Sequence, residues 1–258
     1  MDFRAAAVNG VARRFRIATY NVHKCQGMDG RVMPSRIARV MQEVNADVWA
    51  LQEVLSIQSA QPNMDQAQYL ARELGFFIAL GHVRPLQGGL YGNVVLSRFP
   101  VTCVSNYDIS IKGREERGCL RSDVELGHGE VLHVFNVHLG TAFMERRHQA
   151  RLLVTAELLH QRELGGHRVV LGDFNEWTRG LTSQLLAEHF ACPDVRRLFK
   201  WSRTYPGLLP FMHLDHIYHD PSLKLEHLHL HRSRAALIAS DHLPLVGEFM
   251  ILGSRAAV

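Results

Sequence analysis

The chain contains 258 residues, 47% of them apolar and 21% charged, and carries a formal net charge of +4 with a pI ≈ 9.0. This is enough for a sizeable core, but no run approaches the roughly 18 apolar residues of a membrane-spanning helix, and the arginine-containing start lacks the apolar stretch of a secretion signal. We therefore expect a single soluble, cytoplasmic domain spanning residues 1–258, whose positive charge suits an anionic partner.

The N-terminal part alternates strands with amphipathic helices. Periodicity predicts a strand, a helix and a second short strand, over residues 15–22, 37–44 and 48–52. Asn63 and Gln66 then have the spacing of a helix capping box, and Gly75 is placed to end that helix.

From residue 76 to residue 139 helical periodicity disappears. The β-rich runs FFIAL, NVVLS, VTCVSNYDI, CLRSDVEL and VLHVFNVHL follow one another without helices, which predicts antiparallel hairpins. The remaining pattern predicts helices over about 145–164 and 181–189, and strands near 167–171, 214–218, 223–231 and 243–250. This order favours an α/β fold of mixed sheets covered by helices.

Polar residues stand just past the ends of predicted strands, where open α/β sheets collect ligands. They are Asn21, Glu53, His138, Asp173, Asn175, Asp241 and His242, with Asp215 at the start of its strand. A lone Asn21, Glu53 or Asp215 is more typical of a turn or a helix cap. GDFN is more informative, because glycine permits close backbone approach and two polar residues at this spacing can face one site. SDHLP likewise places a metal ligand beside a general acid or base.

Together, ATYNVH, LQEV, NVVLSRFPV, FNVHLG, GDFN, LDHI and SDHLP resemble the endonuclease/exonuclease/phosphatase (DNase I-like) superfamily, and in particular its small bacterial members of unsettled substrate. The resemblance runs from Arg16 to Phe249 and so implies a core of about 16–249. It implies a four-layer α/β sandwich, in which two packed mixed β-sheets are flanked by helices and the site lies at one edge.

The resemblance also implies a metal site and a histidine held by an acid. Glu53 would be the principal ligand of Mg²⁺ or Mn²⁺, with Asn21 and Asp241 contributing directly or through water, which suits a cation that keeps several waters. His242, oriented by Asp215, would stabilise negative charge in the transition state.

The other implied roles concern the phosphate and the attacking water. Asp173 would orient or deprotonate the water, Asn175 would hydrogen-bond phosphoryl oxygens, and His138 would contact the scissile phosphate. Arg117 matches a position where some relatives place a basic or phenolic side chain near the phosphate. The acid that supports the central histidine in DNase I has no match around Asn93, so the sequence does not predict what orients His138.

Several other features have two interpretations each. The alternating histidines of 227–231 could form a zinc site, or more simply the polar face of a half-buried strand. The basic cluster in 146–151 is either a solvated helix face or a contact for phosphates or a lipid surface. Four aromatic residues either pack in loops or contact bases or lipid: Trp177, Trp201, Tyr205 and Phe211. The scattered cysteines predict free thiols: Cys25, Cys103, Cys119 and Cys192.

The function indicated is hydrolysis of a phosphate diester, in nucleic acid or in a phospholipid-like molecule, by metal- and His/Asp-assisted attack of water. One alternative is a phosphomonoesterase on a soluble metabolite, which would need an added cluster of Lys or Arg to hold a dianion. A non-catalytic phosphate-binding module is another. Because the fold and the site are shared across the superfamily, the substrate depends on the recognition loops. The sequence leaves open the choice of Mg²⁺ or Mn²⁺, endo or exo action, and the oligomeric state.

Overall fold

The computed structural model describes residues 14–57, 65–155, 164–176, 180–192, 205 and 213–252. Its strands are β1 (Arg14–Asn21), β2 (Val48–Ser56), β3 (Phe77–Leu86), β4 (Gly89–Ser97), β5 (Val101–Asp108), β6 (Gly118–Gly127), β7 (Glu130–His138), β8 (His167–Asp173), β9 (Asp215–His219), β10 (Leu223–Leu230) and β11 (Leu245–Ile251). Its helices are η1 (His23–Cys25, a 3-10 turn), α1 (Pro34–Val44), α2 (Gln66–Leu74), α3 (Phe143–Leu153), α4 (Leu181–Ala187) and α6 (Ala236–Ala239).

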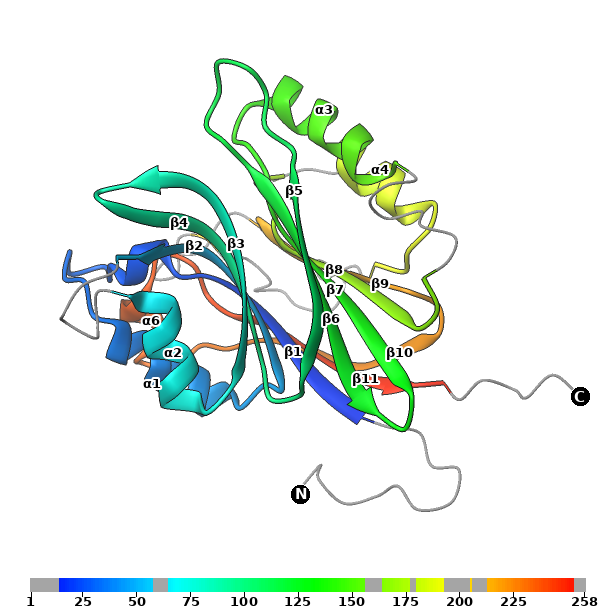
Figure 1. Cartoon of the computed structure of the whole chain (residues 1–258), viewed down its shortest axis with the longest axis horizontal. Helices are drawn as coiled ribbons and strands as arrows, with labels where there is room; N and C mark the ends of the chain where they lie inside the picture. The colour runs from blue at the N-terminus through cyan, green and yellow to red at the C-terminus, as the bar shows by residue number, and fades with distance from the viewer. Residues whose placement is uncertain are drawn as a thin grey trace, which may run out of the picture.

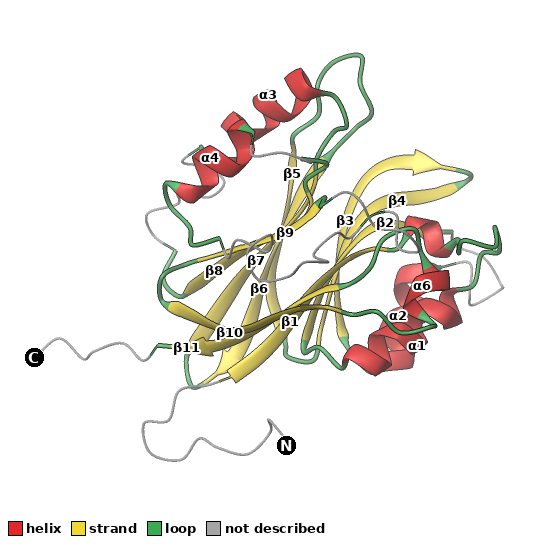
Figure 2. Ribbon diagram, turned by 180° about the vertical axis from the view of Figure 1, so that it is seen from behind, coloured by secondary structure: helices red, strands yellow, loops and turns green. Residues whose placement is uncertain are grey.

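The strands form two mixed sheets that pack face to face. One has the order β10-β11-β1-β2-β4-β3 and the other β5-β6-β7-β8-β9. The pairs β1–β2 and β7–β8 are parallel and the other neighbours are antiparallel. Figures 1 and 2 show α1, α2 and α6 beside the first sheet and α3 and α4 beside the second. The predicted four-layer sandwich is therefore confirmed.

An apolar layer between the sheets forms the centre of the core. Ile17 and Val48 of the first sheet belong to one buried cluster with Leu120, Val134 and Val169 of the second. The opposite faces of the sheets pack on the helices through two further clusters. The central strands are thus buried on both faces, which explains why their sequences are nearly continuous apolar runs.

Helix α1 follows the predicted stripe, with Pro34 at its start and Asn45 in a left-handed conformation at its end. Helix α2 differs from the prediction at its start. Its cap is Asp65, whose side chain accepts a hydrogen bond from Gln68 N at 3.1 Å, so the predicted capping box is wrong, and Asn63 lies outside the described residues. Gly75 ends this helix, as predicted.

The predicted C-terminal elements have the expected type but differ in extent, and the short helix α6 was not predicted. Helix α3 begins at Phe143, and residues 156–163 of the long predicted helix lie outside the described part. Strand β10 contains a register shift between Leu225 and His227, but beyond it the pairing is regular and Leu228 is buried between the more exposed His227 and His229, which favours the polar face of a half-buried strand. All four cysteines are free. In the part of the chain that the structure describes, no helix is long and apolar enough to cross a membrane.

Candidate active site

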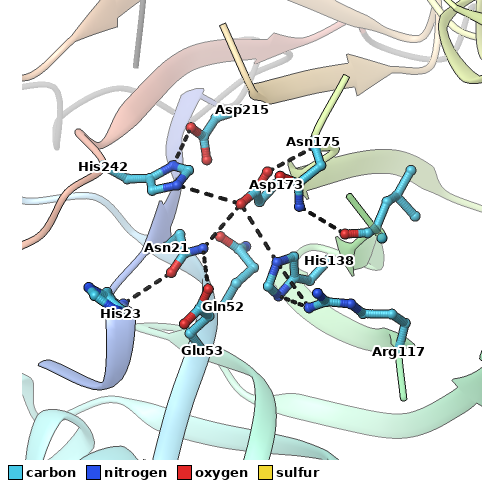
Figure 3. Close-up of polar contacts among 12 residues, drawn as sticks. Asn21, His23, Gln52, Glu53, Arg117, His138, Asp173, Asn175, Asp215 and His242 are labelled. Carbon is cyan, nitrogen blue, oxygen red and sulfur yellow. Dashed lines mark hydrogen bonds and ion pairs between the residues drawn. The ribbon is translucent and has the colours of Figure 1, made fainter. Parts of the chain in front are cut away.

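Strand ends bring the predicted site residues to one edge of the sandwich. The parallel strands β1 and β2 pair Asn21 with Gln52, and the parallel strands β7 and β8 pair His138 with Asp173. Strand β9 begins at the same edge, where Asp215 lies opposite Asp173. Figure 3 shows these side chains converging from both sheets. The site thus forms where the carboxyl ends of parallel strands meet, as predicted, but Glu53 lies inside β2 and not past its end, because this strand continues to Ser56.

Gly172 lets β8 approach β7 closely just before Asp173. Its φ is +146°, and a Cβ atom at this position would overlap the carbonyl oxygen of Val137. The close approach predicted for the glycine of GDFN is therefore present. It sets the separation between His138 and Asp173, the next pair in the register.

A β-bulge turns Glu53 into the site. The pairing of β2 with β4 shifts between Leu51 and Val54, and Glu53 has a φ of +58°. Bulges redirect side chains, and a non-glycine residue in this region stores strain of about 1–3 kcal/mol that folded proteins keep mainly at functional sites.

The Glu53 carboxylate is ionised and has a lysine as its counter-ion. Lys24 Nζ lies 3.1 Å from Oε2, and Asn21 Nδ2 donates to Oε1 at 3.1 Å. Burial opposes ionisation, but His138, Lys24 and Asn21 outweigh it and lower the pKa of Glu53 to about 2. Because the pKa of His138 is lowered to about 4 and its imidazole is neutral near pH 7, Lys24 and Asn21 are the partners that hold this charge.

An unusual backbone segment positions Lys24. His23, Lys24 and Cys25 have φ values of +45°, +56° and +55°. The same turn places the His23 side chain beside Asp241, with Nδ1 3.6 Å from Oδ1. Two neighbouring basic side chains therefore face the two acids that the sequence analysis assigned to a metal.

His242 lies between two aspartates. Its Nδ1 is 2.9 Å from Oδ2 of the fully buried Asp215, and its Nε2 is 3.6 Å from Asp173 Oδ2. Burial disfavours the imidazolium, but Asp215 and Asp173 outweigh it and raise the pKa of His242 to about 10. The Tyr205 ring lies against this imidazole, with ring centroids 4.9 Å apart. His242 is thus protonated at neutral pH and can donate to a developing oxyanion.

Asp173 stands between the two histidines. Its Oδ1 accepts a hydrogen bond from Asn175 N at 2.9 Å, and its Oδ2 accepts one from Asn21 Nδ2 at 3.1 Å and lies 3.7 Å from His138 Nε2. Burial raises the pKa of Asp173, whereas the two histidines oppose that shift. A buried carboxyl with a raised pKa is suited to accept a proton from water.

His138 has an arginine as its partner. Arg117 Nη1 lies 3.0 Å from Nδ1 and 3.1 Å from Nε2, and Arg117 Nη2 pairs with Glu115 at 2.7 Å. A guanidinium only donates, so its contact with both ring nitrogens favours the neutral imidazole, in which one nitrogen is an acceptor. Burial and Arg117 lower the pKa of His138 to about 4, despite the opposing effects of Asp173 and Glu53. The contact with Arg117 answers the open question of what orients His138.

Asn175 lies beside Asp173 with a φ of +48°. Its Nδ2 donates to Leu139 O at 2.9 Å, and the amide carries a second N–H that can donate to a phosphoryl oxygen.

The oxygen donors at the Glu53 end of the site fit a hard divalent cation. Across residues 14–57, 65–155, 164–176, 180–192, 205 and 213–252, no three His, Cys, Asp or Glu side chains form a ready-made metal cage. Mg²⁺ needs none, because it usually takes one or two carboxylates and keeps several waters. Glu53 supplies an ionised carboxylate and Asp241 lies on the adjoining loop, whereas Asn21 turns its oxygen to His23 N at 3.0 Å and its nitrogen to Glu53.

All the residues predicted for the site lie at this edge. Arg117 lies at one margin, beside His138 (Figure 3), and Asp241 lies beside His23. Lys24 was not predicted for the site, and its only signal in the sequence is its position three residues after Asn21. Tyr205, interpreted as either a packing or a stacking residue, lies against His242. The other aromatic residues considered lie outside the described residues: Trp177, Trp201 and Phe211.

Comparison with known proteins agrees with this geometry. The model of the endonuclease/exonuclease/phosphatase family matches residues 18–242, from just before Asn21 to His242. The chain belongs to this family. Members of the endonuclease/exonuclease/phosphatase family hydrolyse phosphate esters. Within it, the chain is 31% identical to YbhP of Escherichia coli (strain K12) over 218 residues, which cover 79% of this chain and 84% of that protein.

Solved structures share the fold of this endonuclease/exonuclease/phosphatase family member. The Beutenbergia cavernae endonuclease/exonuclease/phosphatase has a TM-score of 0.73 at 22% identity, covering 95% of this chain and 73% of that one. The Bacteroides thetaiotaomicron mannosyl-6-phosphatase Bt3783 has a TM-score of 0.70 at 17% identity, covering 91% and 99%. Caenorhabditis elegans TDP2 has a TM-score of 0.69 at 18% identity, covering 92% and 75%. At these identities the likeness concerns the fold.

Proposed function

We propose that the protein is a metal-dependent phosphodiesterase. The observation that carries this proposal is the charge arrangement of the site. The buried Asp215–His242–Asp173 line supplies an imidazolium donor beside a water-orienting acid, and the ionised Glu53 lies across from it next to Asn21. Family members share this reaction class, which makes hydrolysis of a phosphate ester the starting point.

The residues of the chain divide the chemistry between them. Asp173 orients a water and accepts its proton as the oxygen attacks phosphorus. The His242 imidazolium and the second N–H of Asn175 donate to non-bridging oxygens, where negative charge builds up in the transition state. Glu53, with Asp241, would hold Mg²⁺ or Mn²⁺, and Asn21, whose oxygen faces His23 N, would contribute through a water; the metal supplies Lewis-acid stabilisation of the phosphoryl and leaving oxygens when bound.

The balance of charges favours a diester over a monoester. A monoester dianion needs cations beyond those that serve the chemistry. At this edge Lys24 is paired with Glu53, whereas Arg117 shares the single carboxylate of Glu115 with Arg84, which leaves one positive charge unmatched. A diester carries one negative charge and suits such a site better. The fold shared with the mannosyl-6-phosphatase keeps monoester hydrolysis as the alternative to be tested.

The test compares bis-p-nitrophenyl phosphate with p-nitrophenyl phosphate, in Mg²⁺, in Mn²⁺ and in EDTA. We expect metal-dependent cleavage of the diester, and a loss of roughly 10²- to 10⁴-fold in the Asp173→Asn and His242→Ala variants. Plasmid DNA and RNA serve as further substrates for the nucleic-acid alternative. Cleavage of the monoester alone would replace this proposal by a phosphatase, and full activity in either variant would remove these residues from the mechanism.

A further inference from the structure

Exposed apolar side chains gather at the end of the molecule that carries the site. Ten large apolar side chains are exposed in the part that the structure describes. Seven belong to segments at the site edge and are 39–71% exposed: Met28, Val32, Met33, Leu90, Phe143, Met144 and Ile238. The other three lie elsewhere: Phe77, Val104 and Leu252. Large contiguous apolar patches on a soluble protein commonly mark interaction sites.

Four of these side chains form a patch beside the first sheet, which we call the α6 patch: Met28, Val32, Met33 and Ile238. Met28 N donates to Ile238 O at 2.9 Å, so two segments that are distant in the sequence lie side by side. Within the first segment, Val32 forms an antiparallel β-bridge with Gln26. This segment follows Asn21, and α6 leads directly to Asp241. The α6 patch therefore begins within a few residues of the proposed metal ligands.

A second apolar pair lies on the other side of the site. Phe143 and Met144 begin α3, five and six residues after His138, and the Arg147 guanidinium lies 5.6 Å from the Phe143 ring centroid. Figures 1 and 2 show α3 and α6 on opposite sides of the sandwich. Leu90, at the start of β4, pairs with Ser56 at the site end of β2. Apolar residues thus flank the site on both sheets.

The charges around the α6 patch complement an anionic surface. Arg31, Arg232 and Arg234 are exposed in the two segments that form it. The acids of residues 23–36 and 231–241 are Asp29 and Asp241, and Glu43 of α1 contacts the second segment at His231 while it pairs with Arg39. Asp29 is paired with Arg36 at 2.8 Å, and Asp241 faces His23. Apolar side chains bordered by arginines suit the headgroup region of a bilayer, where acyl chains and anionic phosphates meet. The phosphate backbone of nucleic acid provides negative charge but no apolar surface that four exposed apolar side chains could contact.

We propose that the site edge docks on an anionic phospholipid surface, and that the diester hydrolysed there belongs to a phospholipid headgroup. The substrate part rests on the proposed phosphodiesterase function, whereas the docking part does not. With the α6 patch and the start of α3 both entering the interface, the ends of β1, β2, β7 and β8 would face the headgroup phosphates.

Docking is tested with the Asp173→Asn variant, which leaves the vesicles uncut. Co-sedimentation compares vesicles of phosphatidylcholine with vesicles of phosphatidylcholine and phosphatidylglycerol. We expect binding to the anionic vesicles that weakens as salt is raised. Adding Met28→Ser with Ile238→Ser, or Phe143→Ser with Met144→Ser, should weaken binding by about tenfold or more. Thermal melts check that each variant is folded.

The matched control replaces equally exposed apolar residues at the opposite end of the sandwich. Phe77 pairs with Ser97, which also pairs with Val48 at the start of β2, and Leu252 follows β11. Phe77→Ser with Leu252→Ser should leave vesicle binding unchanged. Docking would be overturned by absent vesicle binding, by equal losses in the control, or by unchanged binding in both patch variants. A dimer detected by light scattering and abolished by Met28→Ser with Ile238→Ser would instead identify a second copy as the occupant.

The substrate part is tested separately with the active enzyme. The patch variants should hydrolyse soluble bis-p-nitrophenyl phosphate at the wild-type rate but lose about tenfold or more of the hydrolysis of anionic vesicles. Inactivity on the soluble diester combined with intact vesicle binding would defeat the proposed function and leave docking in place. Vesicle binding without any cleavage of phospholipid, in an enzyme that cuts DNA or RNA, would defeat the substrate assignment alone.

Discussion

His242 gives the site a distinct pH dependence. Because its pKa is raised to about 10 from an ordinary 6.5, the pairing with Asp215 stabilises the folded protein fully below pH about 6.5, and this contribution is lost as the pH rises through about 10. The protonated donor is lost over the same range. We therefore expect kcat/KM for the soluble diester to fall on an alkaline limb near pH 10.

The Asp215→Asn variant should move that limb. Removing a carboxylate 2.9 Å from Nδ1 withdraws the main stabiliser of the imidazolium, so the limb should shift about one to three pH units lower. Full pH–rate profiles of both proteins measure this. Asp220→Asn is the control, because Asp220 is a buried acid paired with Arg168 at 3.0 Å and outside the site. Superimposable profiles for wild type and Asp215→Asn would contradict the pairing.

The effect of Lys24 on metal binding by Glu53 can be measured directly. Lys24 lies where its ammonium competes with any cation for Glu53. Lys24→Met should therefore tighten Mn²⁺ binding by several-fold to about tenfold, because a like charge is removed from a partly solvated site. Isothermal titration calorimetry with Mn²⁺ measures the change, with Lys24→Arg as the charge-preserving control. Glu53→Gln should weaken binding, and an unchanged affinity in both Lys24→Met and Glu53→Gln would place the metal elsewhere.

At the scale of elements, a buried amide pair links the two sheets beneath the site. Asn136 of β7 accepts from Gln52 Nε2 at 2.7 Å and donates to Leu51 O at 2.8 Å and Val94 O at 3.0 Å. Gln52 comes directly before Glu53 in the sequence, and Asn136 lies two residues before His138. The pair therefore fixes β2 and β7 relative to each other where the site begins.

Truncating this link should cost stability. Asn136→Ala removes the shortest of the three hydrogen bonds of Gln52 Nε2 and the side-chain donor to two buried carbonyl oxygens, which should lower the free energy of unfolding by about 1–3 kcal/mol. Urea unfolding measures this loss. In a double-mutant cycle, Gln52→Leu with Asn136→Leu should cost less than the sum of the single changes to leucine, since neither amide is then left facing an apolar replacement of its partner. Additive losses would show that the two amides are not coupled.

The elements also show what could be predicted from sequence. The strands, and the polar residues at their ends, were predictable because apolar runs and the residues that follow them are local features. The start of α2 was not, since Asn63 and Asp65 are both good caps and only the fold selects Asp65. The contacts of Lys24 with Glu53 and of Arg117 with His138 depend on left-handed backbone and on packing between distant strands, which no local pattern encodes.

At the scale of the whole molecule, the site joins the two sheets, and a cation bound there should stabilise the complete fold. Mn²⁺ at one hundred times its Kd should add about 2.7 kcal/mol to the free energy of unfolding. For a chain of this size that corresponds to a rise in Tm of roughly 5–10 °C. Differential scanning calorimetry with and without Mn²⁺ measures it, and Glu53→Gln should show little rise. Equal rises in both proteins would point to binding at another place.

The absence of a side chain at Gly172 has a consequence for how the sequence of such an enzyme can diverge. Because the main chains of β7 and β8 touch there, the distance between the histidine and the aspartate that follow is a property of the scaffold. The loops that surround the site can therefore diverge and meet new substrates while the reacting groups keep their positions. The backbone thus fixes the geometry of the catalytic groups, whereas substitutions in the surrounding loops can change the substrate specificity.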